Sequence, residues 1–198
     1  MAERAILPRR PATFVAIRVG GARHFHGNFV LKGNARMIVI ALGANLNSQA
    51  GAPHDTLRAA LRALEEKNVC IRTLSPFYRT RAWPDPNDPD YVNAAAIVTT
   101  GRSPGELMAL LEQTETRFGR KRSAKNAPRT LDLDIVDYDG RVEEGPPILP
   151  HPRLRERAFV LVPLADIAPG WRHPVTGETV EALIAALPGG TGGVQLPS

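Results

Sequence analysis

The chain has 198 residues, of which 43% are hydrophobic and 23% are charged, a composition typical of a globular domain. No run approaches the ~18 apolar residues that a transmembrane helix needs, so the sequence predicts no membrane partner. Cys70 is the sole cysteine, which excludes an internal disulfide and a multi-cysteine zinc site. We therefore expect a cytoplasmic protein in which Cys70 packs inertly in the core.

The net charge of +5 is unevenly distributed along the chain. Residues 1–36 hold seven lysines and arginines and one acid, Glu3, which leaves residues 37–198 close to neutral. Together with an aromatic content of 6%, this distribution argues against a nucleic-acid partner. We expect residues 1–36 to be a basic, poorly ordered N-terminal extension and residues 37–198 to form the functional domain.

The domain begins with a strand, a helix and two further strands. Residues 38–42 are a short apolar run, which predicts a buried strand. Residues 55–67 carry apolar side chains at helical spacing. Alternation over residues 69–73 predicts a second strand that continues towards Tyr78, and a proline-rich loop separates it from a third strand over residues 91–99.

The rest of the domain adds a helix, a strand and C-terminal helices. Ser103 and Glu106 form a capping box that starts a helix. A fourth strand is predicted over residues 131–138, and helices are predicted over residues 153–167 and 180–187. The order strand–helix–strand–strand–helix–strand predicts a ferredoxin-like α+β fold, with an antiparallel sheet and both internal helices on one face.

Acidic and apolar residues alternate on the fourth predicted strand. Because side chains alternate along a strand, Asp132 and Asp134 share one face while Leu131, Leu133 and Ile135 enter the core, and the aspartate Cα atoms lie roughly 7 Å apart. Mg²⁺ commonly takes one or two carboxylates together with phosphate oxygens. The spacing alone leaves two alternatives of similar weight, a metal site and a merely polar outer face.

Basic residues are concentrated immediately before this strand. Residues 117–129 contain six of them: Arg117, Arg120, Lys121, Arg122, Lys125 and Arg129. Guanidinium groups can bind phosphate oxygens bidentately, so the cluster beside a metal site indicates a triphosphate ligand. The alternative is a solvated helix end favoured by the helix dipole. No glycine-rich phosphate loop of the G-x-x-x-x-G-K-[ST] type is present in the sequence.

Further candidate site residues lie elsewhere in the chain. His151 stands among prolines, and Arg157 and Phe159 place a charge next to a flat ring, which suits a planar heterocycle beside a phosphate. Asn93 is a polar residue within an apolar strand, and a buried amide must be hydrogen-bonded. For each of them a purely structural role is an open alternative.

Several motifs occur together and in one order. They are Gly43-Ala44-Asn45, Phe77–Thr80, Pro89–Ala95, Gly119-Arg120, Pro128–Asp134 and Pro150–Phe159. In these motifs the chain resembles the 6-hydroxymethyl-7,8-dihydropterin pyrophosphokinase family, from Met37 to about Leu187. The resemblance implies a ferredoxin-like fold and transfer of the terminal diphosphate of ATP to the pterin hydroxymethyl group, with release of AMP, in folate biosynthesis.

The resemblance also implies roles for individual residues. Asp132 and Asp134 match its metal site, where two Mg²⁺ ions are expected. The same two aspartates, with Arg120 and Arg129, match its catalytic positions. Those that match its nucleotide site are Arg120 and Arg129, which clamp the phosphates, Glu115, Arg122, His151, Arg157 and, where the adenine packs, Ile135. Those that match its pterin site are Tyr91 and Phe159, which sandwich the ring, and Asn93, Thr80 and Trp83, which lie at its hydrogen-bonding edge.

Two other function classes remain open at this point. An RNA-binding module can have the same order of elements, although the chain lacks the aromatic motif of such modules, and Asp132 and Asp134 would repel phosphate without a metal. A different ATP-dependent transferase or a metal phosphohydrolase could use the same acidic strand. Release of AMP would support diphosphate transfer, whereas release of ADP or free phosphate would not.

Overall fold

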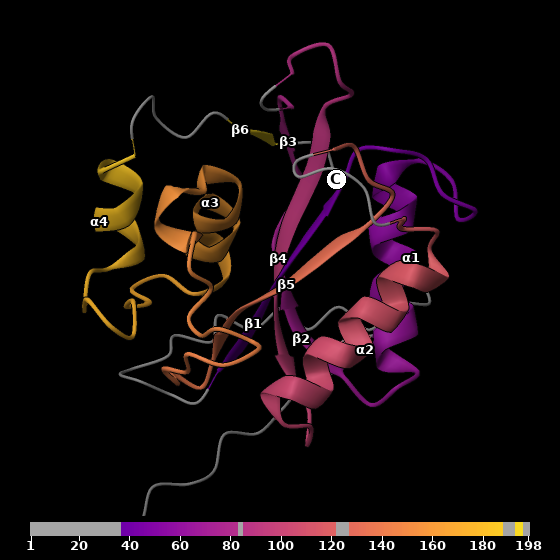
Figure 1. The fold of residues 1–198 in the computed structure, drawn as a ribbon. Helices are drawn as coiled ribbons and strands as arrows, with labels where there is room; N and C mark the ends of the chain where they lie inside the picture. The colour runs from indigo at the N-terminus through magenta and orange to yellow at the C-terminus, as the bar shows by residue number, and fades with distance from the viewer. Residues whose placement is uncertain (1–36, 83–84, 122–126, 188–192, 196–198) are drawn as a thin grey trace, which may run out of the picture.

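The computed structural model describes residues 37–82, 85–121, 127–187 and, as backbone, 193–195. Its centre is an antiparallel sheet with helices on both faces, α1 and α2 on one side and α3 and α4 on the other (Figure 1). The prediction that residues 1–36 are poorly ordered lies outside the described residues.

Within the described residues, the sheet has six strands. They are β1 (Ile38–Ala44), β2 (Cys70–Leu74), β3 (Tyr78–Thr80), β4 (Tyr91–Thr99), β5 (Asp132–Tyr138) and β6 (Gly193–Gln195). The hydrogen-bonded order is β5-β1-β4-β3-β6, and β2 pairs with β4 beside β3. All pairings are antiparallel. This topology confirms the predicted ferredoxin-like α+β fold.

Four α-helices and a short 3₁₀ turn are described. They are α1 (Pro53–Glu65), α2 (Pro104–Arg117), η1 (Leu154–Glu156), α3 (Ala158–Ile167) and α4 (Val180–Ala185). The capping box of Ser103 and Glu106 is present at the start of α2. The prediction of one continuous helix over residues 153–167 is wrong, because Arg157 adopts an extended conformation between η1 and α3. None of the described helices has both the length and the apolarity to cross a membrane.

The predicted second strand is divided into β2 and β3. Pro76 lacks the N–H group that a continuous ladder requires, and the Ser75 hydroxyl instead accepts a hydrogen bond of 3.0 Å from the Ala95 N–H. The prediction that Cys70 packs in the core is also wrong, since its side chain is exposed. Alternation explains this outcome, because Val69 before it is buried and Cys70 points the other way.

Every residue of β1 is buried because both faces of the sheet are covered. Ile38, Ile40 and Leu42 pack into the core beneath α1 and α2. Val39 and Ala41 pack into a second core against α3 and α4. A strand buried on both faces is uniformly apolar rather than alternating, which accounts for the apolar run seen in the sequence.

A β-bulge in β5 shapes the edge of the sheet near the acidic residues. Val39 pairs with Asp137 and Ile40 with Ile135, so Val136 is the extra residue. The freed carbonyl of Val136 accepts a 3.0 Å hydrogen bond from the His151 N–H. The bulge therefore fixes the segment before η1 against β5, close to the carboxylates of that strand.

Candidate functional site

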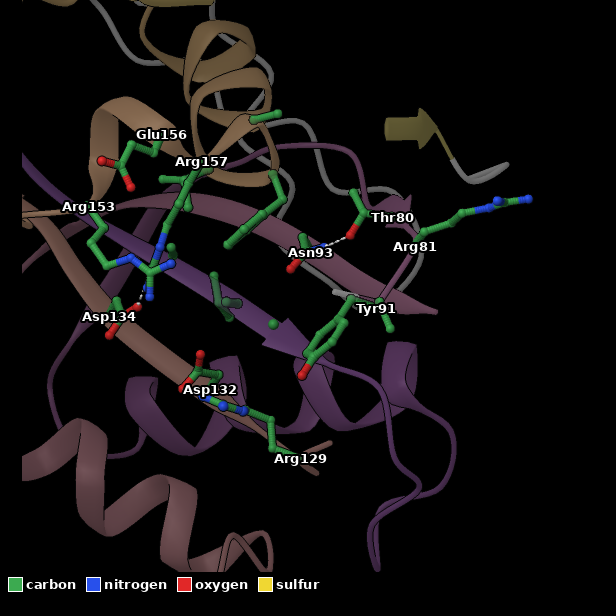
Figure 2. Close-up of a pocket in the computed structure, with 17 residues that line it drawn as sticks. Thr80, Arg81, Tyr91, Asn93, Arg129, Asp132, Asp134, Arg153, Glu156 and Arg157 are labelled. Carbon is green, nitrogen blue, oxygen red and sulfur yellow. Dashed lines mark hydrogen bonds and ion pairs between the residues drawn. The ribbon is translucent and has the colours of Figure 1, made fainter. Parts of the chain in front are cut away.

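The two strand aspartates face one cavity. Leu133 and Ile135 are buried against α1 and α2, whereas Asp132 and Asp134 line a cavity of about 680 Å³ on the opposite face of β5. Residues 157–160, at the start of α3, form its other wall (Figure 2). The predicted common face of the two carboxylates is confirmed.

The structure brings most of the predicted site residues together. Those that line the cavity are Thr80, Tyr91, Asn93, Arg129, Asp132, Asp134, Arg157 and Phe159. Arg120 pairs with Asp132, His151 lies 3.6 Å from Asp134, and Glu115 lies beside Arg120. The Ile135 side chain is buried in the opposite core and does not face the cavity. Trp83 and Arg122 lie outside the described residues.

Asp132 lies between two guanidinium groups. Its Oδ1 atom is 2.8 Å from Arg120 Nη1 and 3.0 Å from Arg129 Nη1. Burial alone would lower the pKa of Arg129, but the charge and hydrogen bond of Asp132, together with the smaller effects of Tyr91 and Asp134, raise that pKa overall. The Arg129 guanidinium therefore stays charged at the end of the cavity nearest the start of β5.

Asp134 has its own pair of basic partners. Its Oδ2 atom is 3.0 Å from Arg157 Nη1 and 3.6 Å from His151 Nε2. The His151 Nδ1 atom accepts a 3.1 Å hydrogen bond from the Arg153 N–H, so in the neutral ring the proton resides on Nε2 and faces Asp134. Burial lowers the pKa of His151, which favours this neutral form.

The two aspartates suit Mg²⁺, which accepts few protein ligands, better than a metal ion whose ligands all come from the protein. The described residues contain no group of three or more histidine, cysteine, aspartate or glutamate side chains that could hold a metal ion. The side chains of Asp132 and Asp134 are 28% and 30% exposed, so their oxygens are accessible from the cavity. Two carboxylates that leave the other ligand positions to phosphate and water match the preference of Mg²⁺.

A glycine separates the acidic end of the cavity from its amide end. Gly43 pairs with Asp132 on one side and with Asn93 on the other. A Cβ atom on Gly43 would lie 3.0 Å from Asn93 Oδ1, tighter than ordinary contact, so a side chain here would displace the amide. The Asn93 Nδ2 group donates a 2.8 Å hydrogen bond to Thr80 Oγ1, which fixes the orientation of the amide (Figure 2).

Two aromatic side chains complete the amide end. Tyr91 and Phe159 both line the cavity, and Phe159 is 39% exposed, which is unusual for a phenylalanine. The Arg157 guanidinium lies 5.5 Å from the centre of the Phe159 ring, within the range of a cation–π contact. Burial raises the pKa of Tyr91, so its hydroxyl stays protonated at neutral pH. Accessible rings beside a fixed amide suit a flat heterocycle.

Asn45 connects both ends of the site, although no role was predicted for it. Its Oδ1 atom accepts a 2.7 Å hydrogen bond from the Arg129 N–H, and its Nδ2 group donates one of 3.0 Å to the Pro89 carbonyl. The Asn45 N–H also donates to the Arg129 carbonyl at 3.0 Å. The available signal was an amide directly after an apolar strand. Cavity residues that were also given no role are Gly43, Arg81, Arg153 and Glu156.

Comparison with known proteins decides the family. The family model for 7,8-dihydro-6-hydroxymethylpterin-pyrophosphokinase matches residues 39–169. The chain belongs to this family. It is 40% identical to a Synechocystis pyrophosphokinase over 148 residues, 74% of this chain and 73% of that protein. It is 36% identical to a Pseudomonas aeruginosa pyrophosphokinase over 153 residues, 76% of this chain and 91% of that protein.

Solved structures agree on the fold. Wild-type HPPK-DHPS of Plasmodium falciparum matches with a TM-score of 0.55 at 14% identity, over 75% of this chain and 44% of that one. This chain therefore spans less than half of that protein, and the match supports the ferredoxin-like fold alone. The family and its relatives show that this chain is an ATP-dependent pyrophosphokinase of folate biosynthesis, with ATP as co-substrate.

A buried carboxyl group lies behind the acidic end of the cavity. Glu115 Oε1 accepts a 2.7 Å hydrogen bond from the N–H of Leu133, between the two aspartates, and forms an ion pair with Arg120. Burial raises the pKa of Glu115 from 4.5 to about 7, even though these contacts act in the opposite direction. The carboxyl group therefore supports β5 and Arg120 from the core side.

The raised pKa of Glu115 predicts pH-dependent stability. Between pH 4.5 and about 7 the folded chain binds more protons at Glu115 than the unfolded chain does. The protonated carboxyl group therefore contributes its full stabilisation below pH 4.5, and this contribution is lost as the pH rises through about 7. We expect the unfolding free energy of the wild type to fall by on the order of 3 kcal/mol across this range, and we expect this fall to be absent in Glu115→Gln. Urea unfolding without nucleotide or divalent cation measures it.

A matched control is available on the same helix. Glu112 is exposed on α2, so Glu112→Gln should keep the pH dependence of the wild type. An unchanged decline in the Glu115→Gln variant would contradict the assignment of the raised pKa to this carboxyl group.

Proposed function

We propose that the cavity between β5 and α3 is the active site in which this enzyme transfers diphosphate from ATP to 6-hydroxymethyl-7,8-dihydropterin. The observation that carries the proposal is that Asp132 and Asp134 face one cavity that is also lined by arginines and by the rings of Tyr91 and Phe159. Carboxylates and arginines suit a metal-bound polyphosphate, and the rings suit a pterin.

The proposal includes two Mg²⁺ ions held by Asp132 and Asp134. When bound, such ions neutralise charge on the phosphate oxygens and orient the phosphate chain. Arg120 and Arg129 lie at Asp132, and Arg157 lies at Asp134, so phosphates on these cations would be within reach of guanidinium groups at both ends. His151 Nε2 lies 3.6 Å from Asp134 Oδ2, too far for a hydrogen bond, so its proton would be donated to the nucleotide there.

The pterin is proposed to lie between Tyr91 and Phe159, with its polar edge at Asn93. The Asn93 amide offers both a donor and an acceptor, which a heterocycle with neighbouring amine and carbonyl groups can match. Thr80 fixes the orientation of that amide. The absent side chain at Gly43 leaves a path from the pterin position to Asp132, along which the hydroxymethyl group would meet the phosphate chain.

The reaction in this arrangement is an in-line displacement. The hydroxymethyl oxygen attacks the β-phosphorus of ATP and loses its proton to solvent, and the bond from that phosphorus to the oxygen bridging to the α-phosphorus breaks. AMP leaves with that oxygen. Arg129 and Arg157 stabilise the negative charge that develops on the phosphates, so positioning and electrostatics carry the catalysis and no covalent nucleophile is required.

Product analysis tests the reaction. With ATP, Mg²⁺ and the pterin alcohol, the enzyme should release AMP and pterin diphosphate in equal amounts, and it should release almost none without the alcohol. Release of ADP or inorganic phosphate instead would contradict the proposal. Titration with Mn²⁺, in the presence of an ATP analogue that cannot be cleaved, should give two bound ions per chain. One ion would contradict that part alone.

We also propose that the partners are small molecules in the cytoplasm, without nucleic acid or membrane. The support is that the acidic face of β5 repels phosphate backbones in the absence of a metal. Salt-sensitive binding of RNA to the Met37–Ser198 fragment would contradict this part.

Residues 37–198 are proposed as the functional domain and residues 1–36 as an extension. The family model matches residues 39–169, entirely within the proposed domain. A chain lacking residues 1–36 should keep kcat and both KM values within about twofold of the full chain. Loss of AMP formation in that variant would contradict the boundary, provided that circular dichroism shows the variant to be folded.

A further inference from the structure

Arg153 is a cavity residue that the functions described so far leave without a role. It lines the cavity and is half-buried, and its side chain is directed towards the end that holds Asp134 and Arg157 (Figure 2). Arg129 and Arg157 each form an ion pair with an aspartate. Arg153 forms none with any acidic residue in the part of the chain that the structure describes.

The backbone of Arg153 is held firmly in place. Its N–H donates a hydrogen bond of 3.1 Å to His151 Nδ1, and its carbonyl accepts one from the Glu156 N–H at 3.3 Å. Leu154, the next residue, is 1% exposed and anchors the turn in the core. The guanidinium group therefore extends from a fixed point at the cavity wall, which reduces the entropy lost when it binds a ligand.

The charge balance around Arg153 favours an anion. Asp134 is already paired with Arg157 at 3.0 Å, so Arg153 adds a positive charge at this end that no carboxylate in the described part of the chain pairs with. Glu156 also lines the cavity, but its side chain is exposed and it forms no ion pair in the described part of the chain. A partly desolvated guanidinium without a carboxylate partner is stabilised by a phosphate, which it can bind with two parallel hydrogen bonds.

We propose that Arg153 is a further ATP-binding residue, which contacts the phosphate chain at the Asp134 end of the cavity. The inference rests on the proposed function, since it assumes that ATP occupies this cavity. It adds a cation on the η1 side of the site, opposite Arg129 and Arg120. The phosphate chain is then held from two walls, by arginines of the loop before β5 and by arginines around η1.

The test compares Arg153→Ala with Arg155→Ala. Arg155 lies on the same turn, but it is exposed and pairs with Glu178 at 2.9 Å, outside the cavity. Calorimetric titration with an ATP analogue that cannot be cleaved should give a Kd about tenfold higher for Arg153→Ala and unchanged for Arg155→Ala. Because alanine keeps the backbone N–H, the hydrogen bond to His151 Nδ1 is retained and the loss reports on the guanidinium.

Further measurements separate ATP contact from a structural effect. The affinity for the pterin alcohol alone should be the same in wild type and Arg153→Ala, and Arg153→Lys should recover part of the ATP affinity. If Arg153→Ala fails to fold, Arg153→Gln, which keeps most of the side-chain length, replaces it. A Kd for the ATP analogue within about twofold of the wild-type value in Arg153→Ala, or in Arg153→Gln where it replaces Arg153→Ala, would overturn the inference.

Failure of the inference on Arg153 can be told apart from failure of the proposed reaction. If the wild type releases AMP in a pterin-dependent way but Arg153→Ala binds the ATP analogue normally, the inference on Arg153 alone is wrong. If the wild type releases no AMP, the proposed reaction fails, whereas weakened nucleotide binding by Arg153→Ala would still support the assignment of Arg153.

Discussion

Replacing Asp134 with alanine should lower kcat for AMP formation at least about a hundredfold. The substitution removes one of the two carboxylates of the proposed metal site and leaves the charge of Arg157 without its partner at 3.0 Å. Asp134→Asn keeps the volume of the side chain and removes only the charge, so it should lose nearly as much activity. Initial rates over a wide range of Mg²⁺ concentrations measure the effect, and thermal unfolding verifies that each variant is folded.

The control for Asp134 is an aspartate on the other side of the sheet. Asp55 is exposed in the first turn of α1, so Asp55→Ala should retain wild-type kinetics. Turnover close to that of the wild type in Asp134→Ala at every Mg²⁺ concentration, low ones included, would contradict the metal assignment. Recovery at high Mg²⁺ alone would instead indicate that Asp134 contributes affinity for the cation without contributing to its position.

The acidic face of β5 could be predicted because two independent patterns agree there. Leu131, Leu133 and Ile135 must be buried, and the period of two then forces Asp132 and Asp134 to the opposite face. The same pattern says nothing about which side chains approach from other elements. The pairing of Arg157 with Asp134 depends on a tertiary contact between residues 23 positions apart.

The break at Arg157 shows why helix prediction failed near the site. Leu154, Val160 and Leu161 are all buried, so the apolar spacing reads as one continuous helix across residues 153–167. The extended conformation of Arg157 accompanies its hydrogen bond to Asp134, an interaction that local sequence does not encode. Departures from local preference are expected at functional sites, where tertiary contacts determine the backbone.

Asn45 and Arg153 illustrate a second limit of sequence reasoning. Both belong to motifs that were recognised, yet neither was given a role. Asn45 binds backbone groups of distant loops, and Arg153 lines a cavity that only the folded chain forms. A buried asparagine after a strand indicates that hydrogen bonds exist without saying to which loops. Cys70 is the opposite case, in which residue type suggested burial and the alternation of β2 placed the side chain outside.

Replacing Arg129 with alanine should slow the chemical step about a hundredfold while it changes the pterin Kd little. Its backbone is fixed by Asn45 on both the N–H and the carbonyl side, so the guanidinium is presented at Asp132 with little freedom. A group positioned in advance at the reacting phosphates stabilises charge that develops in the transition state more than it stabilises the bound pterin. Rapid-quench measurement of a single turnover, with enzyme in excess, isolates this step from product release.

Matched variants show whether this loss reflects geometry or charge. Arg129→Lys keeps the charge but loses the bidentate fork, so it should recover only part of the single-turnover rate. Arg117 is an exposed arginine that pairs with Glu66 at 3.5 Å, and Arg117→Ala should react as fast as the wild type. An effect of Arg129→Ala confined to pterin affinity, with an unchanged single-turnover rate at saturation, would contradict a role in the transition state. Full activity in Arg129→Lys would mean that charge alone, rather than the arrangement fixed by Asn45, is what the reaction requires.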